Sequence, residues 1–337
     1  MASKTFSSTV IADSVSRTGS RLTSLEITFP RVVAAELNTH KVLAKNAASS
    51  RARPPLTVLR DAWENPYVPN EIGVNQSGMV AGEALDGKSL KSVQEQILRH
   101  RDRALVGAFE NLLSTGRIRS FLGDESYTRL LIDGFQGNPE KFELLEDLYR
   151  SILHEYKIGN APYNFYNVHK QIVNRYLEPW LWHTVLVTGT EWDNFVALRA
   201  NPGADPAIRQ SAEKVVESLN ESQPQKRYSG EWHLPFIQES DIAEVNGDIE
   251  TLKKISAGRS ARLSYLTHHN ERSIEKDISL SKRLYEDGHM SPFEHQARPL
   301  EAGETQDSTL LGWKQYRKEL PNENIVHSNL IPHFDGF

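Results

Sequence analysis

The feature that most constrains this chain is a strand pattern joined to a helix start, between residues 21 and 38. Three apolar side chains alternate there with polar ones, at Leu25, Ile27 and Phe29. Alternation of this kind predicts a strand with one buried face. Pro30 then suits the first turn of a helix, and the helix would carry Val33 and Leu37 on one apolar face. Strand and helix together would fix the position of the segment that follows.

That following segment, residues 39–53, is cationic and rich in hydroxyl groups. The last acidic residue before this segment is Glu36, and the segment itself contains none. It carries His40, Lys41, Lys45, Asn46, Ser49, Ser50, Arg51 and Arg53. Serine hydroxyls, backbone N–H groups and guanidinium groups are what a phosphate needs, and an adjacent His and Lys would suit a second anionic group such as a pyrophosphate. A solvated basic loop is the plainer interpretation, and composition alone favours it.

Composition limits the classes of protein that remain. The chain has 337 residues, a net charge of −5 and no cysteine. Without a thiol there are no disulfides, thiolate zinc sites or cysteine nucleophiles, and the acidic balance argues against nucleic-acid binding. No run approaches the roughly 20 apolar residues of a membrane span. The Ser-rich N-terminus lacks the apolar core of a signal peptide, so we expect a cytoplasmic protein without membrane contact.

Two arginines beyond the cationic segment lie near the ends of predicted helices. A helix that runs into Pro179 carries Arg175, and a later helix carries Arg199. An arginine placed against apolar surface needs a partner, and a bound anion is one candidate. A local acid is the other candidate, Glu178 for the first arginine and Asp193 for the second. Spacing alone does not separate these alternatives.

The remaining segments are assigned by pattern. We expect a flexible or edge segment over 1–20, an irregular connection over 55–88, a helix over 89–116, helical pieces over 117–160, helices over 205–220 and 240–257, an extended stretch over 230–238, and two helices with a turn over 256–299. The basic, aromatic stretch 312–320 is predicted to be a solvated helix, with a cover over the active site or an interface as the alternatives. A literal Arg99-His100-Arg101 falls on the exposed face of the helix over 89–116.

The order of residue types in the cationic segment resembles a known signature. Flavin-dependent thymidylate synthases carry Arg-His-Arg-x-x-Ser-x-Asn-Glu-x-Ser-x-Arg. Four residues match it directly, and Lys41 stands for the second Arg: the direct matches are His40, Asn46, Ser49 and Arg51. The sequence departs from the signature where Thr39 replaces an Arg, Ala44 a Ser and Ala47 a Glu.

Two further regions resemble the same family. Asn194 to Arg199 matches Asn-Phe-x-x-Leu-Arg, and Arg175 precedes Pro179 much as in Arg-x-x-Leu-Pro. Residues 261–265 match Ala-Arg-x-Ser-[Phe/Tyr], and residues 289–295 match His-x-[Ser/Thr]-Pro-Phe-Glu-His, the most specific match in the chain. In the usual family the last segment comes first and leads into the strand and basic loop. The chain therefore looks circularly permuted, which is tolerated where termini lie close together at the surface.

The resemblance implies an α/β (α+β) fold, helix-rich with a central antiparallel sheet. It implies a single permuted domain over residues 1–337, with a helical insertion over 89–160 and a C-terminal extension over 300–337. The implied assembly is a homotetramer with the active site at a subunit interface.

The implied activity is transfer of a one-carbon unit from methylenetetrahydrofolate to C5 of dUMP, with FAD as cofactor and NADPH as reductant, giving dTMP. No cysteine is needed, because an arginine beside the pyrimidine would stabilise the developing charge, and Arg199 is the catalytic candidate. The resemblance assigns the nucleotide to Glu36, Ser49, Ser50, Arg51, Arg175 and Arg199. It assigns FAD to His40, Lys41, Asn46, Asn194, Ser264 and His295.

Departures from the signature keep other hypotheses open. Glu36 stands where the family has a Gln that contacts the nucleotide, and a carboxylate cannot donate as an amide does. A hydroxymethylase acting on dUMP or dCMP, in which water captures the methylene group, is the second hypothesis. A non-catalytic flavin- or nucleotide-binding homologue is the third, because Thr39 replaces an arginine. We expect no metal site, since the histidines at 268–269 and 289–295 lack a zinc-motif spacing.

Overall fold

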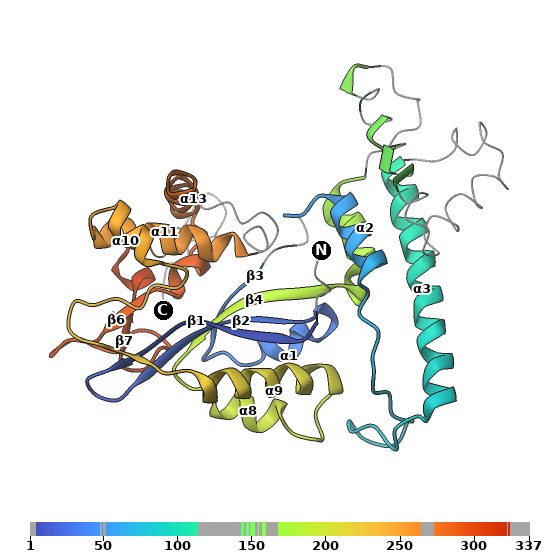
Figure 1. Ribbon diagram of the computed structural model, residues 1–337, viewed down its shortest axis with the longest axis horizontal. Coiled ribbons are helices and arrows are strands. Elements are labelled where there is room, and N and C mark those ends of the chain that lie inside the picture. The colour runs from blue at the N-terminus through green and yellow to red at the C-terminus, as the bar shows by residue number, and fades with distance from the viewer. Residues whose placement is uncertain are drawn as a thin grey trace, which may run out of the picture.

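A five-stranded mixed sheet lies at the centre of the computed structural model, with helices on both sides (Figure 1). The structure describes residues 5–47, 49, 52–113, 143–144, 146–147, 149–151, 154, 157–159, 168–263, 273–321 and 323. The strand order is β3-β4-β2-β1-β5. The strands are β1 (Ser7–Ser16), β2 (Arg21–Pro30), β3 (Ala44–Ala47), β4 (Trp182–Gly189) and β5 (Gln225–Arg227).

Strand pairing corrects two predictions. The predicted sheet is purely antiparallel, but β5 pairs parallel to β1, because the chain first crosses one face of the sheet through helix α9 (Pro206–Glu221). Within the segment over 1–20 that is predicted to be flexible or at an edge, residues 7–16 form β1, which pairs with β2 along its length and with β5 at Ser14–Ser16. A tight hairpin joins β1 to β2, and Gly19 supplies the positive φ of +86° that its turn requires.

Alternation along β2 and β4 gives the sheet two chemically different faces. One face is apolar and carries Leu25, Ile27, Phe29, Val185 and Val187. Helices α1 (Ala34–Asn38), α8 (Asp193–Arg199) and α9 cover it, and their buried side chains include Leu37, Phe195, Ile208 and Val215. The predicted strand, the helix after Pro30 and the helices around 192–199 and 205–220 are confirmed.

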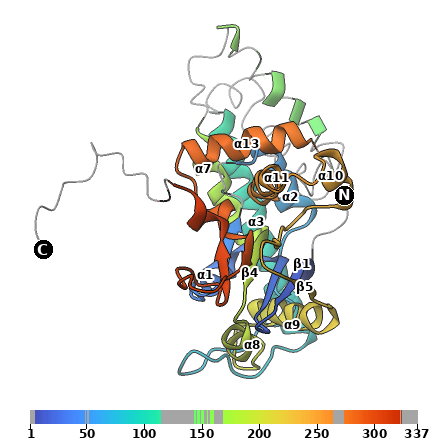
Figure 2. The same ribbon diagram turned by 90° about the vertical axis from the view of Figure 1, so that its left-hand side faces the viewer.

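The opposite face of the sheet is polar. Ser24, Glu26 and Thr28 of β2 lie directly across from Thr188, Leu186 and Thr184 of β4. Helices α10 (Glu239–Glu244), α11 (Ile249–Ala261) and α13 (Ile274–Glu286) lie on this side, and the view in Figure 2 shows the sheet between the two groups of helices. The 3-10 helix Ser291–Glu294 packs against β3 here.

A separate helical layer stands beside the sheet. Helix α3 (Gly87–Leu113) packs on α2 (Pro55–Glu64), on α7 (Lys170–Val173) and on the 3-10 helix Asn174–Trp180. Their shared core contains Val58, Leu59, Ala62, Leu105, Phe109, Leu112, Val173 and Leu177. The predicted helix over 89–116 is confirmed, whereas the predicted irregular connection over 55–88 in fact opens with α2. Most of the predicted helical pieces over 117–160 lie outside the described residues.

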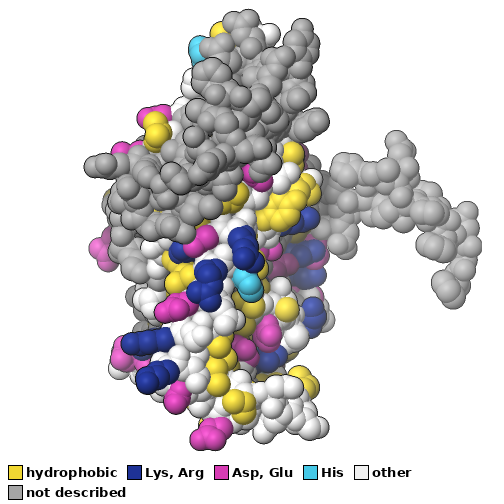
Figure 3. Space-filling model, turned by 90° about the vertical axis from the view of Figure 1, so that its right-hand side faces the viewer, with side chains coloured by type: hydrophobic (Ala, Val, Ile, Leu, Met, Phe, Trp, Pro, Cys, Tyr) yellow, Lys and Arg dark blue, Asp and Glu magenta, His cyan; other side chains and the backbone are white. Residues whose placement is uncertain are grey.

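The outward face of α3 carries charges of both signs (Figure 3). Arg99 and His100 are exposed, and Arg99 lies 3.9 Å from Glu95 one turn earlier. Arg101 instead pairs with Asp102 and donates a hydrogen bond to the Trp63 carbonyl. This literal Arg-His-Arg is therefore part of a helix surface. None of the helices in the described ranges has both the length and the apolar character needed to cross a membrane.

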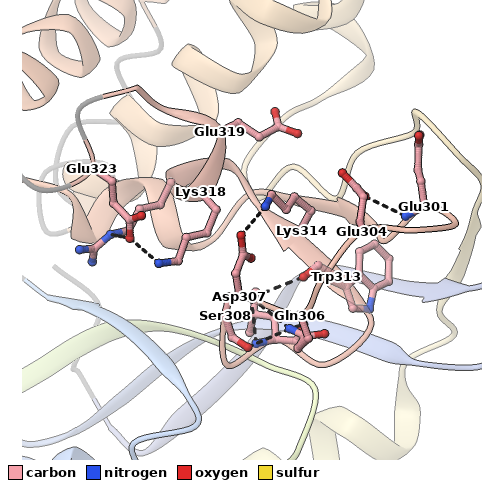
Figure 4. A network of polar contacts seen from close by, with 12 residues as sticks. Glu301, Glu304, Gln306, Asp307, Ser308, Trp313, Lys314, Lys318, Glu319 and Glu323 are labelled. Carbon is pink, nitrogen blue, oxygen red and sulfur yellow. Dashed lines mark hydrogen bonds and ion pairs between the residues drawn. The ribbon is translucent and has the colours of Figure 1, made fainter.

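The segment 300–323 corrects the prediction of a solvated helix over 312–320. Trp313 is fully buried in strand β7 (Trp313–Gln315), which pairs with β6 (Ala297–Pro299), and a 3-10 helix Tyr316–Glu319 follows. Polar contacts hold the loop between β6 and β7, where Glu304 accepts from the Glu301 amide and Asp307 pairs with Lys314; beyond β7, Lys318 pairs with Glu323 (Figure 4). The aromatic residues of this stretch therefore belong to a core and not to a surface.

Helices α11 and α13 are joined by buried ion pairs and an unusually close approach. Arg259 contacts Asp241 at 2.5 Å and Asp277 at 2.9 Å, and all three side chains are almost fully buried. Gly258 lies against the backbone of Asp277, so closely that an added Cβ would overlap its carbonyl group. A buried charge is stable only when it is paired, so the two helices must keep this spacing.

Replacing Gly258 with alanine should therefore destabilise the protein. We expect the free energy of unfolding to fall by about 1–3 kcal/mol, because the new methyl group overpacks the α11–α13 contact. Gly107→Ala in α3 is the matched control: nothing lies within 4 Å of its added Cβ, and the change should raise stability by roughly 0.5–1 kcal/mol. Urea unfolding of both variants measures the difference, and equal effects would contradict the close-packing argument.

Candidate functional site

The turn between α1 and β3 presents the start of the cationic segment. Lys45 of β3 closes this turn by donating to the carbonyls of His40 and Leu43, at 2.5 and 2.8 Å. Burial, followed by the charge of Lys41, lowers the pKa of the Lys45 ammonium group to about 8. Gly189 on β4 leaves the space that Leu43 occupies. Lys41 itself is exposed beside the turn.

His40 and Arg199 meet beside this turn, although they lie far apart in the sequence. Arg199 Nε donates to His40 Nε2 at 3.0 Å, so the proton of the neutral imidazole is on Nδ1. His40 also hydrogen-bonds Asn194, and its ring packs edge-on against Phe195 at 5.1 Å. Burial, followed by the charge of Arg199, lowers the pKa of His40. Three predicted site residues thus form one contact group.

Arg199 also makes contacts with α1. Its Nη2 donates to Thr39 Oγ1 at 3.0 Å and lies 3.4 Å from the Glu36 carbonyl oxygen. The alternative pairing of Arg199 with Asp193 does not occur among its contacts. Glu36 Oε2 is buried and has no hydrogen-bond partner in the described part of the chain. This group therefore contains a cation, an imidazole and an acceptor that is unsatisfied.

A second group lies on the opposite, polar face of β3. Asn46 donates to the Ser260 carbonyl at 2.7 Å and accepts from the Ser291 hydroxyl at 3.0 Å. His295 is fully buried behind it, and its Nδ1 lies 2.8 Å from Thr188 Oγ1. Ser264 lies outside the described residues. The predicted flavin residues are thus divided, with His40 and Asn194 on one side of β3 and Asn46 and His295 on the other.

The predicted phosphate residues form a third, less completely described part. Ser49 is exposed, and Ser50 and Arg51 lie outside the described residues. Arg175 is exposed on the 3-10 helix Asn174–Trp180, whose first residue donates to the Arg53 carbonyl at 3.1 Å. The alternative partner of Arg175, Glu178, pairs with Arg31 at 3.1 Å. Asn174, which directly precedes Arg175, thus contacts Arg53 of the cationic segment, so Arg175 lies near that segment.

Sequence reasoning missed several residues at this site. The sequence indicates Lys45 only as one member of a cationic run. Its place between the matched residues His40 and Asn46 is the signal that could have identified it. Glu26 gave no signal, yet it lies on the polar face and burial raises its pKa. Thr188 was missed because β4 itself was not predicted.

Neither a cavity nor a cluster of possible metal ligands marks the candidate site in the described part of the chain. A cavity of about 310 Å³ lies between β2, α8 and α9 and is lined by Arg21, Thr23, Trp192 and Asn220, away from His40. Within the described ranges, no three His, Asp or Glu side chains lie close enough to hold a metal ion. His268 and His269 are outside those ranges.

Comparison with known proteins adds no assignment: no family model matches this sequence, and no curated protein matches it.

The contact between Arg199 and His40 predicts a change in the pKa of His40. In Arg199→Gln the pKa of His40 should rise, because the neighbouring cation that disfavours the imidazolium is gone. In the wild type, acid favours unfolding, because the folded pKa lies below that of an unfolded histidine; the variant should lose less stability as the pH falls. An NMR titration measures the pKa, with the exposed Arg175→Gln as control. An unchanged pKa in Arg199→Gln would show that the two side chains do not interact in solution.

Proposed function

We propose that this protein is a flavin-dependent enzyme that transfers a one-carbon unit to C5 of a pyrimidine deoxynucleotide, most simply a thymidylate synthase acting on dUMP. One observation carries the proposal: the three regions of resemblance meet at strand β3 and the turn that precedes it. Arg199 reaches His40 across 159 positions, and Asn46 reaches Ser260 and Ser291 across 214 and 245 positions. His40, Arg199, Asn46 and Ser291 are positions matched by pattern, and Ser260 directly precedes the matched segment 261–265, so these contacts support the proposal.

The permuted order is also supported by packing. In the proposed family the segment 289–299 would lead directly into the strand that is β2 here. Ala297 packs with Leu22, the second residue of β2, in one buried cluster with Leu310 and Trp313. The C-terminal segment therefore lies in space where the proposed order needs it, although it comes last in the chain.

The residues present fit a flavin and an anionic nucleotide. Two buried atoms in the two groups lack a partner among the residues that the structure describes, Glu36 Oε2 and His295 Nε2, and a bound ligand would satisfy such atoms. FAD would be held by His40, Lys41, Asn46, Asn194, Ser264 and His295. When bound and reduced by NADPH, it would supply the electrons that convert the transferred methylene group to a methyl group. A homotetramer would bring the groups on the two faces of β3 from different subunits into one site.

The protein's own side chains have separable roles in this proposal. Ser49, Ser50, Arg51 and Arg175 would bind the phosphate through hydroxyl and guanidinium donors. Arg199 would stabilise negative charge that develops on the pyrimidine, and its contacts with His40 and Thr39 already fix its position. One guanidinium nitrogen contacts His40 and another contacts Thr39, so Arg199 is held in place, and no carboxylate of the described residues forms an ion pair with it.

A second candidate function rests on Glu36. Its unsatisfied carboxylate oxygen accepts hydrogen bonds and, when ionised, cannot donate one. Cytosine offers an exocyclic amino group to such an acceptor, whereas the O4 of uracil does not. The alternative is a hydroxymethylase; this contact would favour dCMP as its acceptor, and dUMP is the other acceptor considered. A binding protein without turnover is the third possibility.

The test combines cofactor binding with product analysis. Purified protein loaded with FAD is incubated with NADPH, methylenetetrahydrofolate and either dUMP or dCMP, and the nucleotide is weighed by mass spectrometry. We expect a flavin spectrum and a methyl group added to dUMP. Arg199→Ala should lower kcat/KM by about 100-fold, because it removes charge stabilisation in the transition state. Arg103→Ala, on the exposed face of α3, is the control and should leave the rate unchanged.

Other products would change the proposal in defined ways. A hydroxymethyl product, or activity on dCMP alone, would favour the second candidate function. Bound flavin without turnover on either nucleotide would favour a binding protein. A protein that cannot be loaded with FAD would overturn the proposal.

A further inference from the structure

A continuous line of buried polar side chains crosses the polar face of the sheet and ends at His295. Its links are short: Ser14 Oγ to His233 Nδ1 at 2.9 Å, His233 Nε2 to Ser24 Oγ at 2.8 Å, Ser24 Oγ to Thr188 Oγ1 at 2.6 Å, and Thr188 Oγ1 to His295 Nδ1 at 2.8 Å. All five side chains are almost fully buried. Arg227 touches the far end, with Nε 3.4 Å from Ser14 Oγ.

The two histidines of this hydrogen-bonded chain of side chains, His233 and His295, are neutral at ordinary pH. Burial lowers the pKa of His233 and that of His295 to about 3. A neutral imidazole has one N–H donor and one nitrogen acceptor, and each hydroxyl donates once. The chain therefore has only two fully connected states, in which all donors point toward His295 or all point away from it.

Arg227 decides between these two states. It donates to Ser14 Oγ, so the Ser14 hydroxyl is free to donate onward to His233 Nδ1. In the opposite state Ser14 would receive two N–H groups, and its own proton would have no acceptor among the side chains of this line. A cation at this end also orients each hydroxyl with oxygen toward it. The nearby Asp13 does not reverse this effect, because Arg21 pairs with it through two bonds of 3.0 and 2.7 Å.

We propose that Arg227 polarises this chain so that His295 carries its proton on Nε2 and presents a single N–H donor to a ligand. His233, Ser24 and Thr188 are then positioning residues, since they act only through His295. The Nε2 atom is fully buried and has no partner within the described residues, so an acceptor is missing there. Its acceptor would be a carbonyl oxygen or an unprotonated ring nitrogen. Both occur on the flavin ring, and this ligand assignment rests on the proposed function.

The backbone of β1 is shaped to complete the chain. A β-bulge between Val10 and Ala12 adds one residue to β1 opposite β2. An extra residue reverses which side chains face each side of the sheet. Beyond the bulge Ser14 therefore faces His233, while Asp13 faces away and pairs with Arg21. Without the bulge, a carboxylate would take the place of the hydroxyl beside His233, and the donor direction would reverse.

The experiment reads the proton directly and needs no ligand. Protein labelled with ¹⁵N at histidine Nδ1 is studied by solid-state NMR, with His295→Gln to assign the signal; neutron diffraction of the wild type reads the same proton if that variant does not fold. We expect His295 Nδ1 to be unprotonated. Thr188→Val should protonate it at least partly, because its donor is lost, whereas Thr188→Ser should not. Arg227→Gln should give a mixture, and Arg227→Lys should keep the wild-type state.

The outcomes separate this inference from the proposed function. A protonated Nδ1 in the wild type, or a signal that Arg227→Gln and Thr188→Val leave unchanged, overturns the inference whatever the protein binds. If the tautomer is as expected, FAD should bind Thr188→Val about tenfold more weakly than the wild type, as for loss of about 1.4 kcal/mol of hydrogen bonding. If the expected tautomer is found but FAD does not bind, the hydrogen-bonded chain is supported and the assignment of flavin as its ligand is refuted.

Discussion

The pairing of β2 with β4 is the interaction on which the rest of the structure depends. Because side chains alternate strictly across a strand, this register directs Ile27 and Val185 to one face and Ser24 and Thr188 to the other. The first set builds the core under α8 and α9. The second set contacts the buried histidines. A slip of one residue would move hydroxyl groups into the apolar core and would separate Ser24 from His233 or Thr188 from His295.

The sequence predicts this arrangement only where a pattern is local. The alternation of β2 and the helix after Pro30 are visible in a few neighbouring residues, and both are correct. Strand β1 was missed because its Ser-rich composition is typical of mobile segments, while part of its burial comes from α9 and β5, which lie about 200 residues further along the chain. Strand β4 was missed because its continuous apolar run lies between two segments that attracted attention for their arginines. Trp313 was misplaced because burial against Leu22 is a contact across the whole chain.

The candidate site shows the same limit at the level of single side chains. Sequence order could suggest that Arg199 and His40 belong together, and the structure brings them into contact. It could not show that Lys45 and Asn46 point to opposite faces of β3, since that follows from pairing with β4. The two polar groups are therefore separated by the thickness of a single strand. A ligand or subunit that joins them must pass around the outer edge of β3.

That outer edge has a further consequence for how the protein behaves at high concentration. A strand at the margin of a sheet exposes unpaired backbone groups, and other chains can add to it and form aggregates. Here β3 is only four residues long, and its partly buried lysine holds the preceding turn against it. Shortness and charge both discourage a second strand from pairing there. The residues that make this region cationic thus also protect the sheet from intermolecular growth.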